Sequence, residues 1–155
     1  MIHEIDPHDF NNHFVAGKIP LSTDMIFCYQ SNKMLVDVTH EEPEIPCKNQ
    51  LLFSENVQYI YLFSLDSIAC FLAVNDSPEF NSDFEYREIG FFRGMHRKEI
   101  GWLAVAGFHL YNWYNSHKYC GKCGNQTKHK TDERALICPH CNSVYFPVIS
   151  PAIIV

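Results

Sequence analysis

A long apolar run is missing from this sequence, although 46% of its 155 residues are hydrophobic. The longest apolar stretches are interrupted by Ser, Asp or Asn and fall well short of the roughly 20 residues that cross a bilayer. The N-terminal stretch MIHEIDPHDFNNHF also lacks the basic start and the continuous apolar core of a secretory signal peptide. The sequence therefore predicts no membrane span and a cytoplasmic protein.

Basic residues are few, since 12 Lys and Arg stand against 18 Asp and Glu, for a net charge of -6. A protein that binds a nucleic-acid backbone over its whole surface needs clustered basic side chains. This composition therefore argues against such a protein. The charge is uneven, however: residues 1–116 carry a balance of -9, whereas residues 117–146 carry +3. This shift predicts a domain boundary near residues 114–118.

The chain has seven cysteines, which is an odd number. A reducing cytosol does not maintain a disulfide framework, so we interpret the cysteines as a mixture of core thiols and metal ligands. Cys28, Cys47 and Cys70 are interpreted as inert thiols. Cys70 lies within an apolar stretch, where a free cysteine packs as a small hydrophobic residue.

Strand-forming residues are frequent in the first half of the chain. β-Branched and aromatic residues predict strands over residues 25–29, 34–38, 57–65 and 68–74. Only Asp66 and Ser67 separate the last two strands, and a two-residue loop of this kind predicts a β-hairpin. Residues 40–47 (HEEPEIPC) contain two prolines and three glutamates, which predicts an exposed loop.

A helical pattern follows over residues 97–117. One apolar stripe, at three- and four-residue steps, comprises Ile100, Leu103, Ala104, Gly107, Tyr111 and Tyr114, and a second comprises Trp102, Ala106, Leu110 and Trp113. A helix that is apolar on two sides packs on both, either between two domains or against a partner subunit. A central core helix of the N-terminal domain explains the pattern equally well.

Two C-x2-C pairs follow the predicted helix. They comprise Cys120, Cys123, Cys138 and Cys141, with fourteen residues between the pairs. Each pair can turn two thiolates toward one ion at about 2.3 Å, and two pairs complete a tetrahedron. Gly124 and Asn142 follow the pairs, and these residue types readily adopt the left-handed backbone that such a turn needs. The spacing predicts a zinc site, with the strands of a hairpin in residues 126–137 and its tip near residues 131–133.

Four thiolates close the coordination sphere, so we interpret the predicted zinc as structural rather than catalytic. His117, His129 and His140 lie nearby and could replace a thiolate, but the complete ligand set favours surface histidines. A thioredoxin-like redox motif is disfavoured, because it would open a helix after a strand and would not occur as a matched pair.

Two stretches of the sequence resemble NADH pyrophosphatases of the Nudix superfamily. Residues 97–124 join a helix of small residues to an aromatic-rich end and a Cys-Gly-x-Cys-Gly turn, and residues 138–155 run from an aromatic-Pro pair through Ser-Pro into an apolar strand. The resemblance implies an α+β fold. A Nudix-like β-rich domain with a long C-terminal helix would occupy residues 1–116, a small zinc ribbon residues 117–146, and the first strand of a catalytic Nudix domain residues 147–155.

The same resemblance implies cofactors and partners. Structural Zn²⁺ would be held by Cys120, Cys123, Cys138 and Cys141, while Mg²⁺ or Mn²⁺ would act in the catalytic domain. Members of the family cleave the pyrophosphate of NADH, some remove NAD caps from RNA, and they are typically homodimers. Expected partners are therefore NADH or a related dinucleotide and a second copy of the chain, with no membrane and no nucleic acid other than NAD-capped RNA.

Two aromatic residues are the candidate substrate contacts that the resemblance implies. In the family an aromatic residue before the proline, usually Tyr, helps to form the pocket, and Phe146 occupies this position here, next to Tyr145. The hydroxyl of the usual Tyr is thus missing, and Val148 stands where the family often has Arg. Ordinary aromatic packing under the ribbon is the alternative interpretation for both rings.

The Nudix signature, Gly-x5-Glu-x7-Arg-Glu-x2-Glu-Glu-x-Gly, supplies the carboxylates that hold divalent cations against the pyrophosphate. No stretch of this sequence matches it, so no catalytic residue is assigned. The chain alone is predicted to be an inactive scaffold and dimerisation part. It ends at Val155 in an apolar stretch that would leave an open strand edge, which predicts a fragment whose parent continues into the catalytic domain.

A stand-alone zinc-ribbon adaptor is the alternative function. It would bind protein or nucleic acid through Lys118, Lys122, Lys128, Lys130 and Arg134. Four thiolates around Zn²⁺ add a net charge of -2, so the balance of +3 falls to about +1. This is a small charge for binding a phosphate backbone.

Overall fold

The computed structural model describes residues 4–148 and has an α+β fold, which confirms the predicted fold class. The chain divides into two compact units, with the boundary between His109 and Leu110. Of residues 147–155, which were predicted to begin a catalytic domain, residues 149–155 lie outside the described residues. Within the described part of the chain, no helix combines the length and the apolar character that a membrane span requires.

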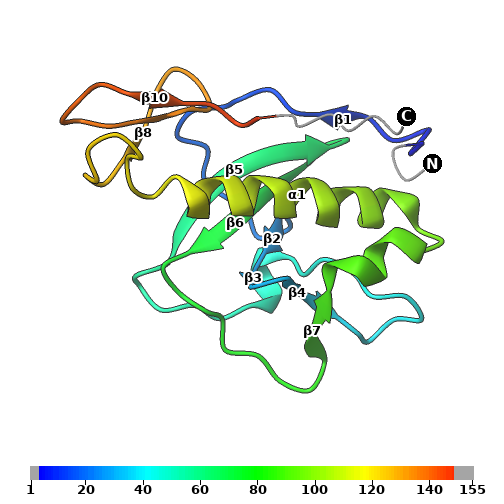
Figure 1. Cartoon of the computed structure of the whole chain (residues 1–155). Helices are drawn as coiled ribbons and strands as arrows, with labels where there is room; N and C mark the ends of the chain where they lie inside the picture. The colour runs from blue at the N-terminus through cyan, green and yellow to red at the C-terminus, as the bar shows by residue number, and fades with distance from the viewer. Residues whose placement is uncertain (1–3, 149–155) are drawn as a thin grey trace. The chain divides into compact units, whose positions relative to one another are not determined.

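Two sheets form the first unit (Figure 1). The first sheet has the strand order β1-β5-β6-β2 and comprises β1 (Phe10–Asn11), β5 (Gln58–Leu65), β6 (Ile68–Val74) and β2 (Met25–Phe27). The second has the order β3-β4-β7 and comprises β3 (Tyr29–Gln30), β4 (Lys33–Asp37) and β7 (Phe84–Glu88). The strand predicted over residues 25–29 is in fact two, because the chain leaves one sheet at Phe27 and enters the other at Tyr29. The other three predicted strands are confirmed.

The β5–β6 hairpin is also confirmed, since the two strands run antiparallel from Leu65 paired with Ile68. In its two-residue loop, Asp66 has a left-handed backbone with φ of 53°. The Asp66 carboxylate lies 2.9 Å from His8 Nδ1 and accepts a 2.8 Å hydrogen bond from the Asp9 N–H. These contacts hold the pKa of Asp66 below its ordinary value and fasten the N-terminal segment to the hairpin.

The core of the first unit contains the side chains of Phe27, Phe63, Phe71, Met34 and Leu72, all nearly or fully buried. Cys28 and Cys70 are buried among apolar neighbours, and burial raises the pKa of the Cys28 thiol to about 12. Burial likewise raises the pKa of Cys70. Both thiols are therefore unreactive near neutral pH, as predicted.

The prediction of an exposed loop over residues 40–47 is partly wrong. Pro43, Ile45 and Pro46 are buried, because isolated bridges pair Glu44 with Asp37 and Cys47 with Met25. The segment thus pairs with the edge strand β2 of one sheet and with Asp37, at the end of β4, in the other.

One long helix, α1 (Lys98–Ser116), confirms the helix predicted over residues 97–117. Two short 3-10 helices, Lys48–Gln50 and Ile89–Gly94, were not predicted. Within the first unit, Ile100, Leu103 and Ala104 of α1 are buried, whereas Trp102 of the second stripe is only half-buried. The first stripe is therefore core, and Trp102 of the second stripe packs edge-on against Phe10 of β1, with ring centroids 5.6 Å apart. A contact of the second stripe with a partner subunit stays a prediction.

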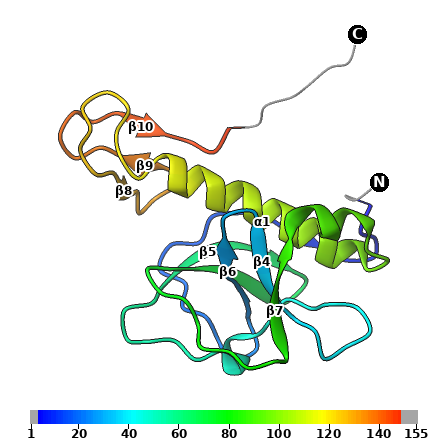
Figure 2. The same ribbon diagram turned by 60° about the horizontal axis from the view of Figure 1, so that its bottom comes forward.

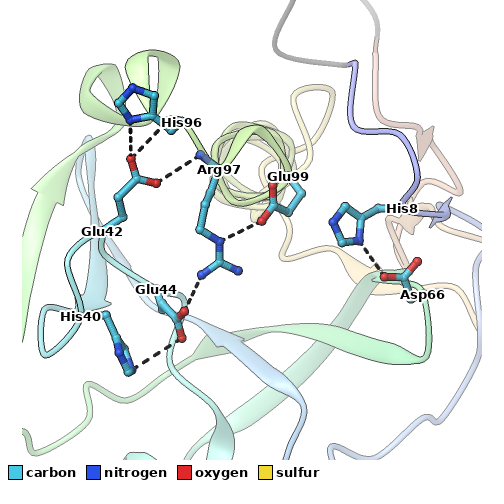
Figure 3. Close-up of polar contacts among 8 residues, drawn as sticks. All are labelled: His8, His40, Glu42, Glu44, Asp66, His96, Arg97 and Glu99. Carbon is cyan, nitrogen blue, oxygen red and sulfur yellow. Dashed lines mark hydrogen bonds and ion pairs between the residues drawn. The ribbon is translucent and has the colours of Figure 1, made fainter.

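The N-terminus of α1 is fastened to the loop after β4 by a carboxylate (Figure 3). Glu42 accepts hydrogen bonds from the Arg97 N–H at 3.1 Å and the His96 N–H at 3.2 Å, and it also lies 2.9 Å from His96 Nδ1. Arg97 in turn pairs with Glu44 and Glu99. Negative charge near a helix N-terminus is favourable, and these hydrogen bonds hold the pKa of Glu42 below its ordinary value.

Replacing Glu42 with Gln should lower the stability of the first unit in a pH-dependent way. A carboxyl group whose pKa is lowered by folding stabilises the fold above its unfolded pKa of about 4.3, and this contribution is lost as the pH falls through the folded value. The difference in unfolding free energy between the native protein and Glu42→Gln should therefore be full at pH 7 and shrink below about pH 4. Urea titrations from pH 3 to 7 measure it. The neighbouring exposed Glu41→Gln is the control, and an equal pH dependence in both variants would contradict the role of Glu42.

Candidate metal centre

The sulfur atoms of Cys120, Cys123, Cys138 and Cys141 lie within 4.8 Å of one another in the second unit. Cys120 and Cys141 are 3.5 Å apart, as are Cys123 and Cys141, and Cys123 and Cys138 are 3.4 Å apart, all measured between Sγ atoms. Four sulfurs at about 2.3 Å from a tetrahedral ion would be separated by about 3.8 Å. The cluster is therefore of the size that one zinc ion requires.

Both C-x2-C pairs fold in the same way. In the first, the Gly124 N–H donates to the Cys120 carbonyl at 2.8 Å, and in the second the Asn142 N–H donates to the Cys138 carbonyl at 2.9 Å. Gly124 and Asn142 have φ of 74° and 58°, the left-handed conformation that the sequence predicted for them. Each turn thus directs two sulfurs toward the same point by means of its local backbone alone.

Three short strands complete this unit (Figure 2). They are β8 (Lys128–His129), β9 (Leu136–Ile137) and β10 (Val144–Tyr145), antiparallel in the order β10-β9-β8. The predicted hairpin is β8 and β9, and the third strand, β10, was missed. Lys130 pairs with Asp132 and Glu133 in the loop at the hairpin tip.

The neighbouring histidines lie outside the sulfur cluster. Among residues 4–148, the only group of side chains close enough together to hold a metal ion is that of the four cysteines. His117 packs against Tyr145 with tilted rings whose centroids are 5.2 Å apart, and His129 lies at the same centroid distance from Tyr114. The interpretation as surface histidines agrees with the exposure of His129 and His140, whereas His117 is half-buried.

The hydroxyl of Tyr145 belongs to the immediate surroundings of the site. It accepts a 3.0 Å hydrogen bond from the Gly121 N–H and lies 3.1 Å from Cys120 Sγ. This contact lowers the pKa of Cys120, whereas burial raises the pKa of Cys138. A metal ion binds thiolates, so its binding must displace the proton of Cys138.

The structure also places the remaining candidate residues. Phe146 follows β10 and is 52% exposed, whereas Tyr145 is half-buried and Val148 is exposed. Contacts of Phe146 and Tyr145 with substrate stay predictions. Lys130 is already paired with acidic side chains, which reduces the charge available for nucleic acid. It is one of the five basic residues proposed for an adaptor, which are Lys118, Lys122, Lys128, Lys130 and Arg134.

A four-cysteine cluster held by two matching turns and a three-stranded antiparallel sheet defines a zinc ribbon with a closed, structural type of metal site. Residues 115–146 match the family model of the NADH pyrophosphatase zinc ribbon domain. Residues 115–146 are therefore similar to the zinc ribbon of NADH pyrophosphatases, as the resemblance noted in the sequence implied.

Curated relatives agree with this assignment. Over 53 residues the chain is 49% identical to the NAD-capped RNA hydrolase NudC of Photorhabdus laumondii, and 47% identical to the proteins of the same name from Escherichia coli K12 and Shigella boydii. Each match covers 34% of this chain and 21% of the relative. The chain thus spans about a fifth of the length of the curated relatives it matches.

Proposed function

We propose that this chain is the N-terminal domain and zinc ribbon of a cytoplasmic, metal-dependent NAD(H) diphosphatase of the Nudix superfamily. The observation that carries the proposal is the match of residues 115–146 to the zinc ribbon of NADH pyrophosphatases. Relatives named as NAD-capped RNA hydrolases support a dinucleotide or an NAD-capped RNA as the substrate of the whole protein. Residues 1–116 would form the first domain, 117–146 the ribbon and 147–155 the start of the catalytic domain.

In this proposal the ribbon holds Zn²⁺ through Cys120, Cys123, Cys138 and Cys141. Bound zinc supplies a rigid tetrahedral cross-link and no open position for water or substrate. The chemistry of pyrophosphate cleavage would use Mg²⁺ or Mn²⁺ held by the carboxylates of a Nudix signature, which the 155 residues do not contain. The chain by itself is accordingly a scaffold that supports a homodimer.

The 155-residue chain should not cleave NADH or NAD-capped RNA in the presence of Mg²⁺ or Mn²⁺. Chromatographic detection of the released mononucleotides tests this, with the protein encoded by the whole reading frame as the active comparison. Cleavage by the chain alone would refute the scaffold role. Inactivity of the whole protein on both substrates would refute the proposed enzyme.

Phe146 is the side chain on the ribbon that we propose as a substrate contact, with the ring of Tyr145 beside it. Its exposure supports this role, because an accessible ring can stack on a base or a nicotinamide, an interaction of about 1–3 kcal/mol. In the whole protein, Phe146→Ala should lower kcat/KM for NADH by about tenfold.

Tyr119→Ala is the matched control for Phe146→Ala, since Tyr119 is another aromatic residue of the ribbon and is 65% exposed. Equal losses of activity in the two variants would mean that Phe146 contributes only to ribbon stability. A loss confined to Phe146→Ala would support the contact.

A further inference from the structure

The extended chain at β10 brings two hydroxyl groups to two sulfurs of the proposed zinc site. Tyr145 Oη lies 3.1 Å from Cys120 Sγ, and Ser143 Oγ lies 3.3 Å from Cys141 Sγ. Residues two apart in an extended chain point to the same side, so one short segment can serve both cysteines. The two cysteines belong to different C-x2-C turns, and the segment therefore touches both halves of the site.

The direction of the Tyr145 hydrogen bond follows from the protonation states of its two partners. A phenol carries one O–H donor and accepts through its oxygen. The Gly121 N–H donates to that oxygen at 3.0 Å, and a thiolate bound to zinc carries no proton, so at the proposed site the O–H donates to Cys120 Sγ. The hydroxyl thus links the backbone of the first turn, one of its sulfurs and the third strand of the ribbon.

We infer that Tyr145 is a positioning residue for the ligand Cys120, and that Ser143 has the same role for Cys141. The inference rests on the proposed four-cysteine zinc site. Four thiolates around Zn²⁺ leave a net charge of about -2, and hydrogen bonds donated to the sulfurs spread that charge and fix the direction of their lone pairs. The geometry therefore gives the Tyr145 hydroxyl a function at the metal that does not require it to contact a substrate.

Tyr145→Phe in the 155-residue chain tests this role, because it removes the hydroxyl and keeps the ring that packs against His117. Loss of a hydrogen bond to a metal ligand typically costs about 10–100-fold in metal affinity, so competition with a chromophoric chelator should show zinc binding weakened by about tenfold. Ser143→Ala should weaken it in the same direction. Tyr119→Phe is the matched control, since it makes the same chemical change on an exposed ribbon tyrosine.

Cobalt substitution separates a role at the sulfur from a general loss of stability. A thiolate that has lost a hydrogen bond is a stronger electron donor, so the thiolate-to-Co²⁺ charge-transfer band of Tyr145→Phe should move to lower energy. Tyr119→Phe should leave the band unchanged. An unshifted band and unchanged zinc affinity in Tyr145→Phe would overturn this inference but not the proposed zinc site. Failure of the native chain to bind either metal would overturn the zinc site and the inference together.

Discussion

Replacing Cys138 with Ser, or removing zinc with a chelator, should unfold residues 117–146 and leave the first unit folded. Each strand of the ribbon has only two residues, and its few buried apolar side chains include Ala135 and Leu136. So small a core cannot offset the conformational entropy of ordering the segment. Zinc binding to small modules contributes about 10 kcal/mol or more, which is enough to decide whether the ribbon folds.

Amide hydrogen exchange resolved by segment measures this outcome, together with the zinc content of the purified chain. Protection should disappear over residues 117–146 in Cys138→Ser and persist in the sheets of the first unit. Cys47→Ser is the control, because Cys47 lies outside the sulfur cluster. A ribbon that stays protected without metal would show that zinc does not hold it together.

The metal site could be predicted from the sequence because its geometry is local. Each C-x2-C turn is closed by hydrogen bonds between residues four and five positions apart, and the left-handed residues Gly124 and Asn142 lie within the same turns. The β5–β6 hairpin was predictable for the same reason, since its strands are separated by two residues. In both cases the contacting residues are close together in the sequence, so their spacing indicates the contact.

Contacts between distant residues left no such pattern. β7 (Phe84–Glu88) was missed because it contains charged residues and is held by pairing with β4, some fifty residues earlier in the chain. The burial of Ile45 likewise depends on bridges to other strands. The hydrogen bond of Tyr145 to Cys120 joins residues 25 positions apart, and no periodicity in the sequence indicates it. Such features follow from the fold and not from a local signal.

Replacing Gly107 with Val should destabilise the first unit by about 3 kcal/mol, although glycine is a poor helix former. A Cβ atom at Gly107 of α1 would lie 2.5 Å from Tyr29 Oη and 2.9 Å from Cδ1 of the fully buried Phe27. At position 107 the side chains of Tyr29 and Phe27 therefore leave no room for a side chain on the helix. Overpacking of this kind exceeds the roughly 0.5–1 kcal/mol gained by removing a helical glycine.

Urea unfolding of the two glycine variants measures the effect. Gly90→Val is the control, because a Cβ atom at Gly90 meets nothing within 4 Å. A loss for Gly107→Val no larger than that of the control would show that the helix can shift away from the sheet without cost.

A double-mutant cycle identifies the atom responsible. The Tyr29 hydroxyl donates a 2.8 Å hydrogen bond to the Ala104 carbonyl, so Tyr29→Phe alone should cost about 1 kcal/mol. The same substitution removes the atom nearest to a Cβ at position 107, so the loss caused by Gly107→Ala should become smaller by about 1 kcal/mol in the Tyr29→Phe background. Strict additivity would instead place the steric conflict at Phe27, whose side chain is fully buried.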